Sequence, residues 1–227
     1  PARHYDLWDI IRDLRDYRLD QGQAQASAAH FVDFLQCLYR FQPSLAGRRL
    51  TLLAHSMGNY ALAFGTDQWF ATPRTPKVLF NTVVLAAADE QSDTFGLPAG
   101  KRLSDLWELS PAITVYSSRE DVLINTSQVV NADWRLGYDG PPNRADTAFF
   151  KPGQYTFVDC TGIEDYTNPL IDSPDRSHQY YRQSETVRQD IARVLRGQDA
   201  PAGARNYDAR RNAYSLTVVP KVTTPTA

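Results

Sequence analysis

The sequence has little of what builds disulfide-rich, metal-binding or membrane-spanning proteins. Its 227 residues include only two cysteines, Cys37 and Cys160, and four histidines. Two cysteines cannot form a disulfide framework, and neither residue type shows the spacing of metal ligands. We expect both cysteines to be reduced and to lie in the core. No run approaches the roughly 18 apolar residues of a membrane span, and no glycine-rich phosphate-binding motif is present. The sequence therefore predicts no cofactor, no metal and no membrane span.

An excess of charge of one sign is also absent. The 24 basic residues nearly balance the 26 acidic ones, for a formal net charge of -2. This balance does not favour binding to nucleic acid or anionic lipid, and a small neutral or amphipathic ligand fits it better. The cluster of Arg205, Arg210 and Arg211 is interpreted as a solvated face. Because the chain begins at Pro1 rather than Met, its start is expected to be processed or truncated, which leaves open both the cytoplasm and a compartment reached through a removed signal.

Short apolar runs alternate with helical patterns along most of the chain. Runs without polar alternation are typical of parallel strands covered on both faces, so the pattern predicts a layered α/β fold. Asp20 and Gln23 form a capping-box-like pair, which predicts the start of the first helix. The predicted strands are residues 50–54, 82–87, 112–116 and 155–159, and the predicted helices cover about 20–39, 58–70 and 179–196.

The remaining segments differ in composition from this pattern. Residues 89–110 and 134–154 are rich in Gly, Pro, Asp and single aromatic residues, so we expect functional loops or small lids there. Residues 1–196 are expected to form one domain with an incomplete amino-terminal part. From residue 197 the sequence is rich in Gly, Ala, Arg and Pro, which predicts an extended arm over 197–227 outside the core.

The strongest chemical signal directly follows the first predicted strand. Residues 54–58 read Ala-His-Ser-Met-Gly, the small-x-Ser-x-small form of a nucleophile elbow, in which a strained turn exposes a serine between a strand and a helix. The N-terminus of that helix favours a developing negative charge, so the Met57 N–H is the predicted oxyanion donor for an attack by Ser56. Ala54 stands where this pattern usually has glycine. The alternative interpretation of Ser56 is an ordinary structural turn.

A serine nucleophile needs a histidine that takes its proton. His4 lies in the polar amino-terminal segment, His30 lies inside the first predicted helix, and His55 is adjacent to the serine. His178 remains, in a polar loop that leads into the last predicted helix. Elimination and position favour His178 as the base, against a loop histidine with a purely structural role.

An acid must orient this histidine, and in α/β proteins with an elbow it follows a later strand, between the serine and the histidine in chain order. Asp121 meets both conditions. Asp89, after the preceding strand, and Glu120 meet them too. Carboxylates at strand ends are often only caps, so the pattern alone leaves these three open.

Five segments of the chain together resemble a bacterial family of α/β hydrolases of unknown function, often labelled DUF900. They are residues 52–59, 84–89, 115–121, 135–137 and 177–181, in the order seen in that family. The resemblance spans about residues 17–196. It implies a three-layer α/β-hydrolase fold with a mainly parallel sheet, and a catalytic triad of Ser56, Asp121 and His178. It raises Asp121 above Asp89 as the acid and says little about the substrate.

One part of the α/β-hydrolase pattern has no counterpart in this sequence. Such hydrolases begin with further strands and a His-Gly type loop, which supplies a second oxyanion donor. Residues 1–8 do not resemble this loop. The amino-terminal strands are therefore expected to be missing, or to be supplied by a second chain.

These observations lead to two hypotheses. The first is a serine esterase that cleaves a small-molecule ester through an acyl-enzyme, without a cofactor. The second is a catalytically silent hydrolase-like domain that binds a ligand or a protein partner. The missing loop motivates the second, because losing one oxyanion donor slows acyl transfer by roughly 10²–10³-fold.

Overall fold

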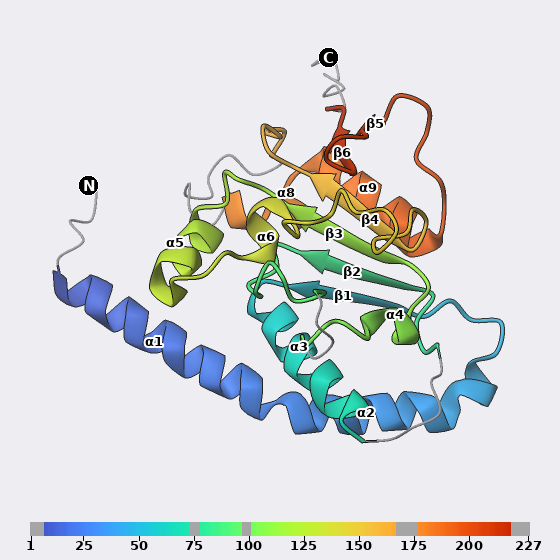
Figure 1. Cartoon of the computed structure of the whole chain (residues 1–227), viewed down its shortest axis with the longest axis horizontal. Coiled ribbons are helices and arrows are strands. Elements are labelled where there is room, and N and C mark those ends of the chain that lie inside the picture. Colours follow the sequence, from blue (N-terminus) through green and yellow to red (C-terminus); the bar gives the residue numbers. More distant parts are fainter. Residues whose placement is uncertain (1–6, 73–77, 97–100, 167–176, 219–227) are drawn as a thin grey trace, which may run out of the picture.

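The computed structural model describes residues 7–72, 78–96, 101–166 and 177–218. Helices and strands alternate along most of the chain (Figure 1). In chain order the elements are α1 (Leu7–Ala26), α2 (Ala28–Phe41), the short 3₁₀ helix η1 (Gln42–Leu45), β1 (Thr51–His55), α3 (Met57–Phe70), β2 (Thr82–Ala86), α4 (Leu106–Leu109), β3 (Ile113–Ser117), α5 (Val122–Asn131), α6 (Leu136–Asp139), β4 (Tyr155–Asp159), α8 (Tyr180–Gln183), α9 (Glu185–Arg196), β5 (Arg205–Asp208) and β6 (Ala213–Leu216).

One six-stranded sheet organises the molecule, in the order β1-β2-β3-β4-β6-β5. All neighbouring strands are parallel except β5 and β6, which are antiparallel. The four strands predicted from the sequence correspond to β1 to β4, each within one residue of its predicted bounds. Because β1 to β3 run in the same direction, the segments that follow them meet at one edge of the sheet.

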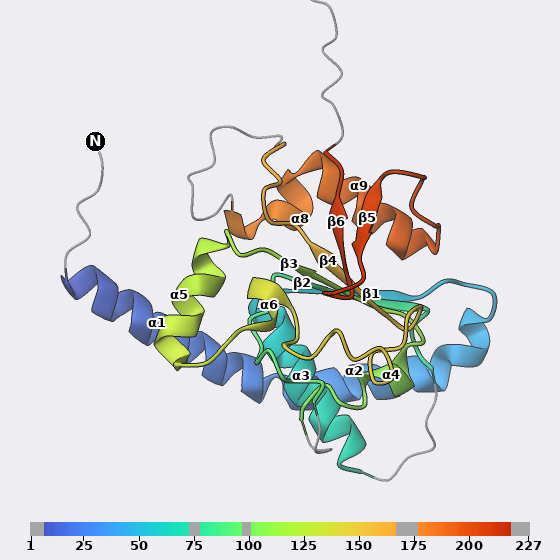
Figure 2. The ribbon, with the colours of Figure 1, turned by 45° about the horizontal axis from the view of Figure 1, so that its top comes forward.

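Helices cover both faces of the sheet and make three layers (Figure 2). The alternation of side chains along β2 shows the arrangement. Val83 and Leu85 pack into a core cluster that includes residues of α2 and α3, whereas Val84 packs on the other side with Val187 and Ile191 of α9. Both faces of a parallel strand are thus buried, which is why these strands read as continuous apolar runs. The predicted three-layer α/β fold is confirmed.

The helix boundaries at both ends of the chain correct the sequence predictions. The first helix does not begin at Asp20, which lies inside α1. No glycine or proline interrupts residues 7–21, so the helix extends back from Asp20 to Leu7. The last predicted helix is split into α8 and α9 at Ser184, whose Oγ accepts a hydrogen bond from Val187 N at 3.1 Å and so caps α9.

The carboxy-terminal segment also differs from its prediction. It was expected to lie outside the core, but β5 and β6 extend the sheet, and β6 pairs with β4 in parallel with Val158 opposite Tyr214. Ala213 and Leu216 are buried in the two core clusters. Most other side chains of β5 and β6 are polar or exposed, so the sequence here carries no apolar run that would reveal the strands.

Two predictions of burial are wrong as well. Cys160 is buried, as expected, but Cys37 is exposed on α2. Conversely, Arg205 does not belong to a solvated face, because its guanidinium forms an ion pair of 2.7 Å with the buried carboxylate of Asp190. Side chains in an amphipathic helix or an edge strand alternate between core and solvent, and composition alone does not show which way one of them points.

Gly137 fixes the segment after α5 against the end of β2. Its N–H donates to Ala88 O at 2.9 Å, and its carbonyl accepts from Ser118 N at 3.0 Å. A Cβ atom at this position would lie only 2.4 Å from Ala88 N. The absence of a side chain therefore allows the chain after α5 to lie directly on the strand ends where the candidate site is found.

Among the described residues, β1 pairs with β2 alone, so its other edge carries no strand. The β1 side chain of Leu53 is 37% exposed. A second chain that pairs with this edge stays a prediction, which native mass measurement of the purified protein would test: a single species of the mass of this chain contradicts it.

Candidate active site

Ser56 occupies the sharp turn between β1 and α3 in a strained backbone conformation. Its φ of 53° and ψ of -128° lie in a region that residues with a side chain rarely adopt. Backbone contacts hold the turn: Ser56 N donates to Ala86 O at 3.1 Å, and Ser56 O accepts from Asp89 N at 3.3 Å. The fully buried Asn59 adds side-chain hydrogen bonds to the carbonyls of Ser56 and Ala86, each 3.3 Å long. These contacts thus stabilise the strained conformation of Ser56.

Met57, the next residue, begins α3. Its N–H has no hydrogen-bond acceptor among the described residues, as is usual in the first turn of a helix. This donor lies at the positive end of the helix dipole. It is therefore available to an anionic group beside Ser56.

The structure brings together His178 and Asp121, two of the residues singled out in the sequence. His178 Nδ1 lies 2.9 Å from Oδ2 and 3.1 Å from Oδ1 of Asp121. Asp121 is fully buried and His178 is 4% exposed. Asp121 also caps α5, because its Oδ1 accepts hydrogen bonds from Leu123 N at 3.1 Å and Ile124 N at 3.0 Å. The helix N-terminus thus holds the carboxylate in place.

The two rival carboxylates contact other groups. Asp89 accepts a hydrogen bond from Tyr17 OH at 2.7 Å and pairs with Arg135 Nε at 3.3 Å. Glu120 accepts from the backbone N–H of Gly162 at 2.9 Å. Neither carboxylate has a hydrogen bond to His178. Asp121 is the one of the three that the fold places against this histidine.

His55 connects the turn of Ser56 to the loop of His178. Its Nε2 donates to the His178 carbonyl at 3.2 Å, and the two imidazole rings have centroids 4.6 Å apart. The other neighbour of His55 is Tyr181, with ring centroids 4.1 Å apart in a stacked arrangement. Among the described contacts there is no hydrogen bond between Ser56 Oγ and His178 Nε2. Such catalytic contacts are often long without a substrate.

The His178 loop is also anchored to the strand ends. Tyr180 OH donates to Tyr116 O at 2.9 Å and accepts from Ala87 N at 3.0 Å. Sequence reasoning did not assign a positioning role to Tyr180, Asn59 or His55. The only signal was that all three lie within the segments shared with the family named above, next to the candidate catalytic residues.

His55 gives the site a pH-dependent stability. Burial, followed by the nearby His178 and Arg182, lowers the pKa of His55 from 6.5 to about 4. The unfolded chain then takes up the proton more readily, so stability falls as the pH drops from about 6.5 to 4. Urea unfolding at pH 7 and at pH 4.5 measures how much unfolding free energy the protein loses on acidification. We expect His55→Gln to make this loss smaller by about 2 kcal/mol. His30→Gln, at an exposed position of α2, should leave the loss unchanged. An equal acid loss in wild type and His55→Gln contradicts the assignment.

The buried pair of Asp89 and Arg135 predicts a large effect on stability. Asp89 and Arg135 are 3% and 4% exposed. Tyr17 of α1 also donates a hydrogen bond to the Asp89 carboxylate. Burial and Asp89 raise the pKa of Tyr17 to about 12. Asp89→Asn leaves the Arg135 charge unpaired in the interior, and we expect a loss of about 3–5 kcal/mol in the free energy of unfolding.

The matched control is Asp93→Asn, because Asp93 forms an exposed ion pair of 2.9 Å with Lys101. We expect it to change the unfolding free energy by under about 1 kcal/mol. Urea unfolding of both variants measures the difference. A loss below about 1 kcal/mol in Asp89→Asn would show that the pair does not stabilise the fold.

The described residues include no group of three or more His, Cys, Asp or Glu side chains that could hold a metal ion. Likewise, none of the helices in the described ranges has the length and apolar character needed to cross a bilayer.

A mostly parallel sheet between two helical layers, with a serine in the turn after β1 and a buried His–Asp pair at the same end, defines a protein with an α/β-hydrolase fold. Residues 8–194 match the sequence model of a family described as alpha/beta hydrolase of unknown function (DUF900). The chain belongs to this family. No curated protein and no solved structure gives a significant match.

Proposed function

We propose that this protein is a serine hydrolase that cleaves a small-molecule carboxylic ester through an acyl-enzyme. The observation that carries the proposal is the buried pair of His178 and Asp121, linked by His55 to the strained turn of Ser56. A serine held beside a helix N-terminus, a histidine and a carboxylate are the groups that acyl transfer requires.

In the first half of the reaction, Ser56 Oγ attacks the ester carbonyl carbon while His178 Nε2 takes the hydroxyl proton. The Met57 N–H donates to the oxyanion of the tetrahedral intermediate. When the ester C–O bond breaks, His178 returns the proton to the alkoxide and an alcohol leaves. Asp121 accepts from His178 Nδ1–H throughout, so it keeps Nε2 free to act as base and stabilises the imidazolium.

In the second half, His178 removes a proton from a water molecule, which attacks the acyl carbon. The acyl–oxygen bond to Ser56 breaks, the serine regains its proton from His178, and a carboxylic acid is released. Thioesters and amides undergo the same steps with a different leaving group. A panel of oxygen esters, thioesters and amides, graded by acyl length, therefore identifies the substrate class.

The decisive experiment is labelling with a fluorophosphonate, which phosphonylates activated serines. We expect one adduct per chain, located on the peptide that contains Ser56 by mass spectrometry. Circular dichroism and a cooperative thermal transition show that the labelled sample is folded. Folded protein without an adduct on Ser56 would sink the enzyme proposal.

The second candidate is a catalytically silent domain that binds a ligand or protein partner. Two observations favour it: Met57 supplies the one oxyanion donor identified among the described residues, and Ser56 forms no hydrogen bond to His178 here. Folded protein that fails to react with the fluorophosphonate and hydrolyses no ester of the panel would support this candidate.

A further inference from the structure

The structure has a hollow that is not lined by Ser56, Asp121 or His178. It has a volume of about 510 Å³ and is bordered by residues that follow β2, by α6 and the loop after it, and by the turn between β5 and β6. None of the three candidate catalytic residues lines it. The residues that line it include Trp134, Tyr138, Asp139, Arg144, Arg210 and Arg211.

One wall of this pocket is aromatic. Trp134 is 66% exposed, an unusual state for the largest apolar side chain. Its ring lies near that of Tyr138, with centroids 6.0 Å apart and planes inclined by 36°. Solvent-exposed aromatic faces beside a hollow are suited to stacking against a flat ligand.

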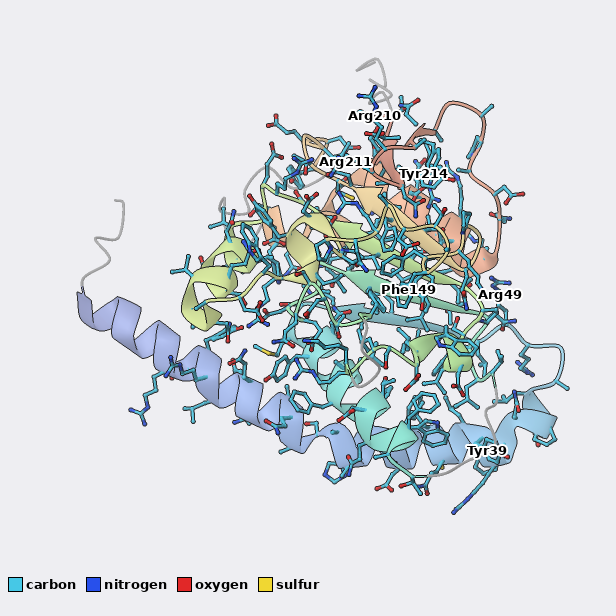
Figure 3. The ribbon with its side chains drawn as sticks, viewed as in Figure 1. Tyr39, Arg49, Phe149, Arg210, Arg211 and Tyr214 are labelled. Carbon is cyan, nitrogen blue, oxygen red and sulfur yellow. The ribbon has the colours of Figure 1, made fainter. Side chains whose placement is uncertain are left out.

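Arginines form another part of the lining. Arg210 and Arg211 lie at the turn between β5 and β6 (Figure 3). Arg211 is held in place by Asp139 at 2.7 Å and Asp159 at 2.8 Å. The Arg210 guanidinium, in contrast, has no hydrogen-bond or ion-pair partner in the part of the chain that the structure describes.

Arg144 supplies a second unused donor. The residue is 8% exposed and bonds to Asp139 and to two backbone carbonyls through its terminal nitrogens, yet its Nε has no partner in the described structure. A buried donor without an acceptor is unfavourable unless another group satisfies it.

The charges around the pocket do not cancel. Four guanidiniums and three carboxylates lie in or next to the pocket, so one positive charge is in excess. Arg135 also lines the pocket, but its charge is neutralised by Asp89. The guanidiniums belong to Arg119, Arg144, Arg210 and Arg211, and the carboxylates to Asp139, Asp159 and Asp208. Asp208 accepts from the backbone N–H of Arg210 and not from its guanidinium. Ion pairs fix Arg144 and Arg211 before any ligand arrives, which lowers the entropy that these two side chains lose on binding.

We propose that this pocket binds a small aromatic ligand that carries an oxyanion, either a carboxylate or a phosphate. The aromatic ring stacks on Trp134 and Tyr138. The oxyanion accepts hydrogen bonds from Arg210, whose planar guanidinium matches two oxygens of a carboxylate or phosphate group. The site needs neither Ser56 nor ester cleavage.

Isothermal titration calorimetry with benzoate and phenyl phosphate tests this site, with benzamide as the neutral control. The protein carries Ser56→Ala, so that no covalent chemistry contributes and failure of the proposed hydrolase leaves the test intact. We expect at least one of the two anions to bind with a Kd of about 1 mM, the range for ligands of this size, and benzamide to bind at least tenfold more weakly. The relative affinities of benzoate and phenyl phosphate show which oxyanion the site takes.

Three further substitutions locate the bound ligand. Arg210→Gln and Trp134→Ala are each expected to weaken binding by about tenfold, because one removes a charged hydrogen-bond donor and the other the stacking surface. Arg40→Gln is the matched control. It replaces an exposed arginine on α2, next to Tyr39, which lies across the molecule from Arg210 (Figure 3). The proposal is overturned if neither anion binds, if benzamide binds equally well, or if the two pocket variants bind as tightly as Arg40→Gln.

Discussion

Replacing Ser56 with alanine is expected to abolish labelling by a fluorophosphonate and to lower kcat/KM for ester hydrolysis by at least about 10⁴-fold. The hydroxyl oxygen is the atom that forms the acyl bond, so its removal leaves no covalent route. The fold should not suffer, because alanine is strained at φ 53° much as serine is. Ester hydrolysis and mass spectrometry of the labelled protein measure the effect.

Two further variants separate chemistry from strain. Ser56→Gly is equally unable to react, yet it relieves a strain of about 1–3 kcal/mol and should raise the unfolding free energy relative to Ser56→Ala. Ser27→Ala, at an exposed position between α1 and α2, is expected to keep full labelling. Labelling that persists in Ser56→Ala would assign the nucleophile to another residue.

Replacing Asp121 with asparagine is expected to lower kcat by about 10⁴-fold while the protein stays folded. The asparagine Oδ1 still accepts from Leu123 N and Ile124 N, so the cap of α5 is kept. Its amide group then donates to His178 Nδ1, which places the imidazole proton on Nε2. A histidine in this tautomer cannot take a proton from Ser56.

Glu120→Gln is the matched control, since Glu120 is adjacent in sequence and contacts the Gly162 N–H instead of the histidine. Its activity should change by less than about threefold. Asp121→Ala should show the same loss of activity as Asp121→Asn, together with about 1 kcal/mol of lost stability from the missing cap. A loss of less than tenfold in Asp121→Asn, measured by steady-state kinetics on folded protein, would exclude the proposed role.

The central sheet could be predicted because each of its first four strands is recognisable from its own short stretch of sequence. Strands buried on both faces favour mainly apolar segments without charges, and residues 82–86 and 113–117 carry only apolar, tyrosine and hydroxyl side chains. The strand at residues 205–208 has mainly exposed side chains, and backbone pairing with residues 213–216 holds it in the sheet. Pairing between edge strands depends on the backbone, and polar sequences of this kind resemble loops.

The candidate site likewise has one residue that the local sequence suggests and others that it does not. Ser56 could be proposed as a nucleophile because a strand, a small-residue turn and a helix follow one another within a few residues. The partners Asp121 and His178 are 57 positions apart, and choosing between Asp121 and Asp89 required the family resemblance. One partner of Asp89 in its structural role is Tyr17, 72 positions away. Contacts over such separations are set by the packing of whole elements, which local patterns do not encode.

The close contact at Gly137 has a consequence for evolution. Any other residue would push its Cβ to 2.4 Å from Ala88 N and displace the segment that carries Trp134, Tyr138 and Arg144. Divergence within the family should therefore be uneven here. The pocket-lining positions can vary as ligands change, whereas position 137 should remain glycine in every member that keeps this loop.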